Sequence, residues 1–389
     1  MNKKIIILSS LVVILAIIGG ALLFFSKGDN GDGDSGLSQY FPFFNNGNGN
    51  GGGFIPQDTA YPLPSSINRN LIQLFSQPIS GVAFIGDKVR YIEKTTGHIF
   101  DVNVDGAERN RISNTTILKS FETLWSFDAK NVVIRYFEDN TSTLSVRNFS
   151  GSTASSSLEG IFLPADAKTL AVSPSESRIF YLIPYGENNL GMTADFNDKK
   201  QEKVLTVTFG DFNAGWPSKN IIAFNTRPSK DIEGSLYLLN LKTKGFEKIL
   251  SGINGLTSLV SPQADKVLFS QIISGKIISK IFDIAKNETN DFPIATLAEK
   301  CVWGVKNQEM IYCAMPSFLP SASYPDDWYK GLVSFDDSIW SVNLETGEVF
   351  LLAEKTGLDI INPVLDSQEN YMIFMNKKDS SLWILDLLE

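Results

Sequence analysis

Acidic and aromatic side chains are concentrated in one short stretch, YPDDWYKGLVSFDD, at residues 324–337. Paired carboxylates can transfer protons or bind a hard cation such as Ca²⁺ through their oxygens. The stretch lacks the calcium-loop pattern D-x-[DN]-x-[DN]-G, so we assign it no catalytic and no metal-ligating residue. Aromatic rings are instead typical of recognition surfaces. The candidate binding residues are Tyr324, Asp326, Asp327, Trp328, Tyr329, Asp336 and Asp337.

The chain has two cysteines, Cys301 and Cys313, at the ends of the segment CVWGVKNQEMIYC. If this segment is a hairpin that turns at Asn307, the two residues face each other on adjacent antiparallel strands. Their Cα atoms then lie about 4.5–5.5 Å apart, a separation that a disulfide accepts. We therefore predict a disulfide, with two buried free thiols as the alternative.

Histidine is represented by a single residue, His98. A structural zinc site needs about four nitrogen or sulfur ligands and a catalytic one about three protein ligands, usually including histidine. A Ser-His-Asp triad would have to use His98, which lies in the strand-like segment YIEKTTGHIFDVNVDG. We assign His98 a structural role and predict no cofactor.

The formal net charge of −9 and the lack of any Lys/Arg cluster beyond the first four residues argue against nucleic acid as a partner. Proteins that bind nucleic acid present basic stripes to the phosphates. The expected partners are therefore a membrane and a protein or glycan.

A predominantly apolar run covers residues 5–25, directly after Lys3 and Lys4. As a helix these 21 residues span about 30 Å, the thickness of the hydrocarbon core of a bilayer. The segment GALLFFSKG offers no A-x-A cleavage pattern, so we predict an uncleaved signal anchor, with cleavage as the alternative. The positive-inside rule keeps residues 1–4 in the cytoplasm and exports the chain that follows the anchor.

Gly, Asn, Asp and Ser dominate residues 26–66, as in NNGNGNGGG. Such a composition does not bury enough apolar surface to fold. We predict a flexible linker with a root-mean-square reach of roughly 35 Å.

Short apolar strands alternate with polar turns throughout residues 67–389, which indicates an all-β domain. Seven segments share one plan, a strand end, a short polar turn and an apolar strand. They are residues 84–94, 125–137, 172–184, 216–228, 260–272, 303–316 and 365–377.

An Asp or Asn before an apolar residue recurs once after each of these hairpins. These residues are Asn103, Asn148, Asp195, Asn240, Asp283, Asn343 and Asp386, at intervals of 45, 47, 45, 43, 60 and 43 residues. A period near 45 with about four strands per unit predicts a seven-bladed β-propeller. The Asp or Asn side chains are expected to bond to turn backbone.

The last repeat supplies three strands. The segment NLIQLFSQPISGVAFIG, at the start of the predicted propeller, resembles the outer-strand segments of earlier repeats. We therefore expect residues 71–75 to add the outer strand of the last blade. Such a closure removes exposed sheet edges.

The single long interval, 60 residues, places an insertion between the second and third strands of blade six. YPDDWYKGLVSFDD lies in this insertion, on the face where propellers often bind ligands. Pro316, Pro320 and Pro325 are expected to stiffen it. The alternative is a loop folded over its own blade with the aromatic rings packed inward.

The segments SPSESRIFY and SPQADKVLF, and the strand endings IFDVNVDG and LYLLNLKTKG, resemble those of TolB-like and WD-repeat-like β-propellers. The resemblance covers roughly residues 70–389, and extends to the propeller half of dipeptidyl-peptidase-type proteins. The chain contains no G-x-S-x-G nucleophile elbow. The resemblance implies binding or scaffolding and supplies no catalytic residue.

We therefore expect a membrane-anchored, extracytoplasmic propeller, of bacterial type, that binds or scaffolds a protein, glycan or envelope component. Two alternatives stay open: a hydrolase or lyase with its site in the propeller funnel, and a subunit of a secretion or pilus-type envelope assembly.

Overall fold

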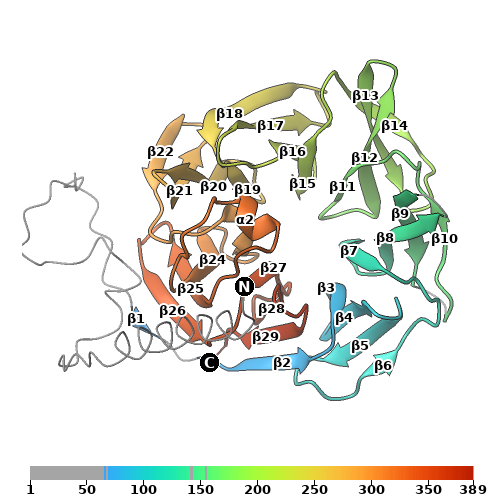
Figure 1. The fold of residues 1–389 in the computed structure, drawn as a ribbon, viewed down its shortest axis with the longest axis horizontal. Coiled ribbons are helices and arrows are strands. Elements are labelled where there is room, and N and C mark those ends of the chain that lie inside the picture. The colour runs from blue at the N-terminus through green and yellow to red at the C-terminus, as the bar shows by residue number, and fades with distance from the viewer. Residues whose placement is uncertain (1–64, 67–68, 141–142, 154–155, 389) are drawn as a thin grey trace, which may run out of the picture. The chain divides into compact units, whose positions relative to one another are not determined.

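The computed structural model describes residues 65–66, 69–140, 143–153 and 156–388. Seven sheets, antiparallel except for one short added strand, stand side by side in a ring around a central opening (Figure 1). The prediction of an all-β, seven-bladed propeller is confirmed.

Each of blades one to four has four strands, numbered from the centre outward. They are β3 (Ile79–Ile85), β4 (Lys88–Glu93), β5 (Ile99–Asn103) and β6 (Asn110–Arg111); β7 (Ser120–Trp125), β8 (Asn131–Asn140), β9 (Thr143–Ser152) and β10 (Glu159–Phe162); β11 (Thr169–Val172), β12 (Arg178–Tyr185), β13 (Asn188–Asp195) and β14 (Glu202–Val207); β15 (Phe212–Ser218), β16 (Ile221–Thr226), β17 (Glu233–Asn240) and β18 (Phe246–Asn254).

Blades five to seven follow the same order, and blade six has a fifth strand at its outer edge. They are β19 (Thr257–Val260), β20 (Lys266–Ile273), β21 (Lys276–Asp283) and β22 (Glu288–Asp291); β23 (Cys301–Trp303), β24 (Met310–Pro316), β25 (Asp337–Asn343), β26 (Val349–Glu354) and β1 (Ser65–Ser66); β27 (Ile360–Leu365), β28 (Tyr371–Asn376), β29 (Leu382–Asp386) and β2 (Leu71–Phe75). The described residues also form two short helices, η1 (Ala298–Lys300) and α2 (Asp326–Tyr329).

The second strand of a blade is covered on both faces by its neighbours, so its apolar residues need not alternate. In β12 the run Ile179–Leu182 is buried without a break. Phe180 of blade three meets Phe224 of blade four edge to face, with ring centroids 5.3 Å apart. Full burial of one such ring contributes roughly 1.5–3 kcal/mol to folding. The core is therefore a series of apolar clusters between blades.

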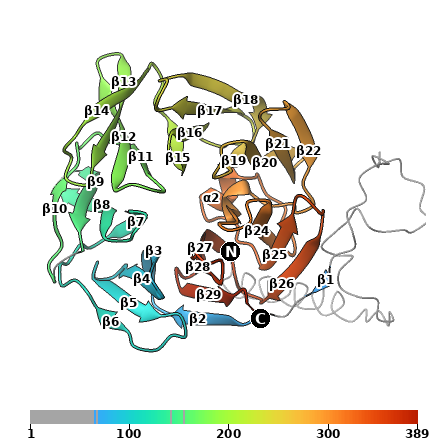
Figure 2. The same cartoon turned by 180° about the vertical axis from the view of Figure 1, so that it is seen from behind.

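The strand β2, near the start of the propeller, closes the ring. β2 pairs antiparallel with β29, with Leu71 opposite Leu385 and Ile72 opposite Ile384. This is the position that the sequence comparison assigned to residues 71–75. The outermost strand of blade seven, β2, therefore comes from the beginning of the propeller sequence, and the other three strands come from its end (Figure 2).

Five of the seven repeated Asp and Asn residues cap turns, as expected, whereas Asn148 lies within β9. Asn240 Oδ1 accepts the backbone N–H groups of Lys242 and Thr243, at 3.0 and 3.2 Å. Asn343 does the same with Glu345 and Thr346, at 2.9 and 3.2 Å. The equivalent side chains of Asp195, Asp283 and Asp386 also accept turn N–H groups. Their recurrence reflects turn geometry.

The predicted cytoplasmic residues 1–4, the predicted anchor at 5–25 and most of the predicted linker lie outside the described residues. The last two linker residues, Ser65 and Ser66, form β1 and pair parallel with Phe350 and Leu351 of β26. Within the described part of the chain, no helix is both long and apolar enough to cross a membrane.

Candidate functional site

The insertion of blade six comprises residues 317–336, between β24 and β25. It carries the helix α2, which lies at the rim of the central opening near β19 and β27 in both views (Figures 1 and 2). The predicted connection between the second and third strands of blade six is confirmed.

Three aromatic side chains of the insertion point inward. Tyr324, Trp328 and Phe335 are each at most 3% exposed and form one apolar cluster with Ile277 of blade five and with Leu297. The rings of Trp328 and Phe335 stack with centroids 5.8 Å apart at an angle of 12°. The cluster joins the insertion to its neighbours as well as to its own blade.

Beneath these rings lies a fully buried ionic cluster of Lys300, Asp337 and Asp359. Lys300 Nζ lies 2.7 Å from Asp359 Oδ1, 2.8 Å from Asp337 Oδ2 and 2.8 Å from the carbonyl oxygen of Ile360. An ammonium group has three protons, and all three have acceptors here. Lys300 is therefore held as a structural cation and has no free donor for a substrate.

Asp359 ties the insertion to blade seven. Its carboxylate accepts the indole N–H of Trp328 at 3.0 Å and the backbone N–H of Phe335 at 3.1 Å. Lys377 Nζ, also in blade seven, donates to the carbonyl oxygen of Trp328 at 2.7 Å. Burial lowers the pKa of Lys377, and the Asp359 carboxylate opposes that change.

Asp337, the first residue of β25, lies below the insertion rather than on its surface. Its Oδ2 accepts the backbone N–H of Ile360 at 2.6 Å, while its Oδ1 is buried and has no hydrogen-bond partner. Burial raises the pKa of Asp337 to about 6, against the opposing effect of Lys300. The unpartnered oxygen is consistent with a carboxyl group that holds a proton more firmly than usual.

The helix α2 is anchored to blade four through Asp326. This carboxylate accepts the hydroxyl of Ser229 at 3.0 Å and the backbone N–H of Lys230 at 2.8 Å. Burial alone would raise the pKa of Asp326, but these two hydrogen bonds outweigh it and lower the pKa. The insertion thus reaches from blade six to blade four.

The other two acids also make internal contacts. Asp327 accepts the backbone N–H of Ser323 at 2.8 Å. Asp336 pairs with Lys378 Nζ and accepts the backbone N–H of Gly357 at 3.0 Å. Asp327 therefore fixes a turn within the insertion, and Asp336 joins the insertion to blade seven.

The seven candidate binding residues thus separate into two groups. Tyr324, Trp328 and Asp337 are buried and closed to a partner while the insertion holds this conformation. Tyr329 is 40% exposed and donates its hydroxyl to Glu299 at 2.9 Å. Sequence analysis did not single out the two most exposed apolar side chains of the insertion, Phe318 and Leu332.

Cys301 and Cys313 are directly opposite in the register of β23 and β24, and a disulfide joins them. Both are buried. The bond links the two strands that precede the insertion.

Exposed apolar side chains gather on one side of the ring. We call insertion face the side on which the chain enters each innermost strand and turns from each second strand to the third. Of twelve large apolar side chains exposed among the described residues, nine lie on it: Leu118, Phe162, Tyr185, Phe209, Ile232, Ile273, Phe318, Tyr329 and Leu332. Phe127, Val305 and Leu388 lie toward the opposite face.

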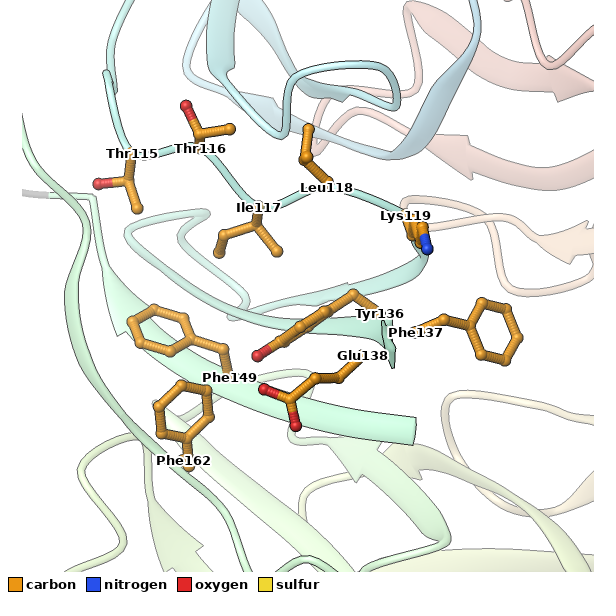
Figure 3. Close-up of a pocket in the computed structure, with 10 residues that line it drawn as sticks. All are labelled: Thr115, Thr116, Ile117, Leu118, Lys119, Tyr136, Phe137, Glu138, Phe149 and Phe162. Atoms are coloured by element: carbon orange, nitrogen blue, oxygen red, sulfur yellow. The ribbon is translucent and has the colours of Figure 1, made fainter. Parts of the chain in front are cut away.

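A pocket opens on the insertion face of blade two, with a cavity of about 430 Å³ (Figure 3). Ligand pockets in proteins span about 300–1,000 Å³. One wall is the connection Thr115–Lys119, which leads into β7. The other wall is formed by three strands and carries Tyr136, Glu138, Phe149 and Phe162.

The side chains of this second wall share one face of the sheet. Phe149 lies opposite both Ile134 of β8 and Phe162 of β10, and Tyr136 and Glu138 follow Ile134 at alternate positions. Their side chains reach toward the pocket, whereas the ring of Phe137 turns away (Figure 3). Phe137 packs on Phe121 instead, with centroids 4.6 Å apart.

The first wall is fixed by contacts with both blades beside it. The backbone N–H of Ile117 donates to the carbonyl oxygen of Thr96 at 3.1 Å, and Thr115 Oγ1 accepts the backbone N–H of Leu158 at 2.7 Å. Gly97, at φ 75°, lets the turn approach, because a Cβ there would lie 2.3 Å from the carbonyl oxygen of Ile117. His98 Nε2 lies 3.2 Å from Thr116 Oγ1. The pocket wall is therefore preformed.

Sequence analysis did not find this pocket. Its residues come from four separate segments with ordinary repeat intervals of 45 and 47 around them. Within the described residues, no group of three or more His, Cys, Asp or Glu side chains lies close enough together to hold a metal ion.

Comparisons with known proteins identify the fold. The structure resembles an oligogalacturonate lyase in complex with manganese (TM-score 0.57, 10% identity, covering 82% of this chain and 94% of the lyase). It also resembles the Pan2 WD40 domain of Neurospora crassa (TM-score 0.54, 14% identity, 84% and 98%). TolB of Acinetobacter baumannii matches with a TM-score of 0.41, at 13% identity over 81% of this chain and 65% of TolB.

No family model and no curated protein matches this sequence. The structural matches share so little sequence that they establish fold and no activity. The resemblance to WD-repeat-like propellers therefore holds at the level of the fold.

Proposed function

We propose that this propeller is a binding module that docks a protein partner on its insertion face, held at the outer side of a membrane by residues 5–25. The single observation that carries the proposal is the uneven distribution of exposed apolar side chains, nine on the insertion face against three toward the other. Apolar and aromatic residues are what the centre of a protein interface buries.

A protein partner fits these side chains better than a glycan does. Of the nine, four are Leu or Ile, three are Phe and two are Tyr, so seven of them are hydrocarbon side chains without a polar group. Aliphatic side chains gain free energy by removing apolar surface from water, and hydroxyl-rich sugars offer little such surface. The acidic net charge of −9 further favours a partner with basic groups near the contact.

The proposed location rests on sequence. The apolar run at 5–25 has the length of a membrane-spanning helix, and the Gly- and Asn-rich residues that follow give a spacer between membrane and propeller. Protease added outside intact cells should degrade the propeller, and alkaline extraction should leave it in the membrane fraction. Release by alkali, or protection in intact cells, would contradict the proposed location.

The docking face is tested by capture of partners from native membranes with the full-length chain after cross-linking. The test variant changes Phe318→Ser and Leu332→Ser, which remove two exposed side chains of the insertion. The matched control changes Phe127→Ser and Val305→Ser toward the opposite face. We expect the test variant to lose most of the captured protein and the control to lose none; equal capture by both would overturn the assignment of the face.

The same capture distinguishes a transient partner from an assembly. Recovery of several neighbours in fixed ratio would favour a subunit of a secretion or pilus-type envelope assembly. A single protein in variable amount would favour a tethered binding module.

The rival function is a hydrolase or lyase with its site in the funnel. The observation in its favour is the fold shared with an oligogalacturonate lyase. Incubation of the full-length chain with oligogalacturonate and Mn²⁺, followed through the ultraviolet absorbance of unsaturated products, tests it. Turnover together with a failure to capture any protein would replace the binding proposal by an enzyme.

A further inference from the structure

The pocket of blade two has one wall of aromatic rings. The rings of Phe149 and Phe162 meet edge to face, with centroids 5.5 Å apart, and Tyr136 lies on the same face of the sheet. Ile117 and Leu118, in the connection into β7, belong to the facing wall, and the cavity of about 430 Å³ lies between the two walls (Figure 3). An occupant of this cavity would therefore meet apolar side chains on two opposite sides.

Both walls leave apolar surface in contact with water. Phe162 is 60% exposed, and Leu118 on the facing wall is 56% exposed. A group that enters between them covers both side chains, and the gain in free energy grows with the apolar area removed from water. Aromatic rings also make favourable edge-to-face or offset contacts with other rings. The wall of rings thus favours an aromatic occupant.

The charged side chains of the pocket are already engaged. Lys119, Tyr136 and Glu138 line the cavity, and none of the three is without an interaction partner in the protein. A charged group of a ligand would have to compete with these existing contacts and would also lose its hydration in the pocket. The pocket therefore favours an occupant without charge.

The hydroxyl groups of the pocket wall are engaged as well. Thr115 Oγ1 accepts the backbone N–H of Leu158 at 2.7 Å, and Thr116 Oγ1 lies 3.2 Å from His98 Nε2. A sugar would bring several hydroxyl groups that lose their hydrogen bonds to water, and the apolar walls cannot replace them. A hydrocarbon ring has no such bonds to lose, so an aromatic side chain fits this pocket better than a sugar.

We propose that the pocket of blade two receives an uncharged aromatic side chain of the protein partner that docks on the insertion face. This inference rests on the proposed function and names the anchor residue of the partner. Leu118 and Phe162, at the pocket, are two of the nine exposed apolar side chains of that face. Aromatic residues that fill a pocket on the partner commonly dominate the energy of a protein interface.

The pocket is formed before anything binds. The connection that makes its first wall is held by a hydrogen bond from the backbone N–H of Ile117 to the carbonyl oxygen of Thr96 and by the bond between Thr115 and Leu158. Binding does not have to order this wall, so little of the interaction free energy is lost to conformational entropy.

The probe is the pentapeptide Ser-Gly-Phe-Gly-Ser, acetylated, amidated and para-fluorinated on its ring. It is titrated with the full-length chain in detergent and followed by the line width of its fluorine NMR signal. We expect Phe162→Ser and Leu118→Ser each to weaken binding roughly fivefold or more, because the probe's ring loses an apolar contact on one wall. Phe127→Ser, which removes a ring that is 54% exposed toward the opposite face, should leave binding unchanged. Uptake of the probe by detergent is common to all variants, so the differences between variants report on the pocket.

Unlabelled competitors test the chemistry of the occupant. The same pentapeptide without fluorine should displace the probe, whereas pentapeptides with Lys, Glu or Ser in place of Phe, and methyl glucoside, should not. No binding of the probe, or equal binding by Phe162→Ser and the unchanged chain, would overturn the inference. Displacement by the Lys or Glu peptide as effective as by the Phe peptide would refute an uncharged occupant, and displacement by methyl glucoside alone would replace it by a glycan site.

Failure here differs from failure of the proposed function. If membrane capture depends on Phe318 and Leu332 but not on Phe162, the docking face stands and the blade-two site is wrong. If capture depends on none of the three, both are wrong.

Discussion

Blade six and blade two both depart from the repeat on the insertion face, yet in opposite ways. The insertion of blade six has twenty residues between its strands and folds inward, with Tyr324, Trp328 and Phe335 buried against its neighbours. The hairpin of blade two stays in a regular ladder and extends beyond its outer strand, which leaves a pocket open beside it. Added length therefore closes one part of the face and opens another.

The difference follows from what each segment can bury. The insertion brings large rings to a recess where Lys300 pairs with Asp337 and Asp359, and where Asp359 accepts the indole N–H of Trp328. The strands of the hairpin bond to each other and to β7 and β10 within the same sheet, so the hairpin does not have to fold over its neighbours. Four predictions test this contrast, from the largest expected effect to the smallest.

The largest effect is expected for Asp359→Ala. It removes the acceptor shared by Lys300, Trp328 and the backbone of Phe335, and leaves a buried ammonium with less compensation. Breaking a buried ion pair by removing one partner costs roughly 3–5 kcal/mol. Urea unfolding followed by tryptophan fluorescence measures the loss. Asp336→Ala, at the exposed pair with Lys378, is the control and should cost less than about 1 kcal/mol.

The second effect is a pH dependence of the free energy of unfolding, which arises from Asp337 beneath the insertion of blade six. The pKa of Asp337 is raised to about 6 in the folded protein from a usual value of 3.8, so the folded state binds the proton more tightly than the unfolded state. The stabilisation is complete below the unfolded value and is lost as pH rises toward 6, with a slope of at most about 1.4 kcal/mol per pH unit.

Asp337→Asn isolates this contribution, because an amide does not titrate. The free energy of unfolding of the variant, compared with that of the unchanged chain, should change with pH between the two pKa values, from about 4 to about 6. Above about pH 6 the difference should become constant. A constant difference across this range would show that burial of Asp337 does not shift its titration.

The third effect, an intermediate loss of stability, is expected for a change at Trp328. Trp328→Phe keeps a ring over Phe335 but removes the indole N–H that Asp359 accepts at 3.0 Å. A buried charged acceptor that loses a partner costs roughly 1–3 kcal/mol. Limited proteolysis should then cut within residues 317–336 more quickly, whereas Tyr329→Phe, at the exposed end of the helix, should leave the rate nearly unchanged.

The smallest effect on stability is expected in blade two. Phe162→Ser changes a side chain that is 60% exposed, so the free energy of unfolding should change by no more than about 0.5 kcal/mol. The thermal unfolding midpoint measures it. A loss as large as that of Trp328→Phe would show that Phe162 supports the fold, and the contrast between a closed and an open region would fail.

Sequence analysis predicted the ring because each blade repeats the same local chemistry. Residues such as Asn240 and Asn343 cap the same turn in successive units, and this recurrence is visible at a fixed interval. It also located the insertion, because 60 residues in place of about 45 is a property of the sequence. The opposed cysteines, Cys301 and Cys313, follow from hairpin symmetry in the same way.

Sequence analysis could not predict which side chains of the insertion are buried and which are exposed. Trp328 and Tyr329 are adjacent and chemically alike, yet one is buried and the other is 40% exposed. What separates them is Asp359, which is distant in sequence and meets Trp328 only once blade seven is in position. The blade-two pocket was missed for the same reason, since Ile117 and Phe162 face each other only after blades one and two pack.

The sequence by itself therefore determined the repeat, the number of blades, the closing strand and the place of the insertion, because these depend on local pattern and spacing. The tertiary structure alone decided which aromatic rings are buried, where Lys300 finds its carboxylates and where a pocket opens. Those outcomes depend on contacts between blades, and a contact between blades joins residues whose separation along the chain carries no pattern.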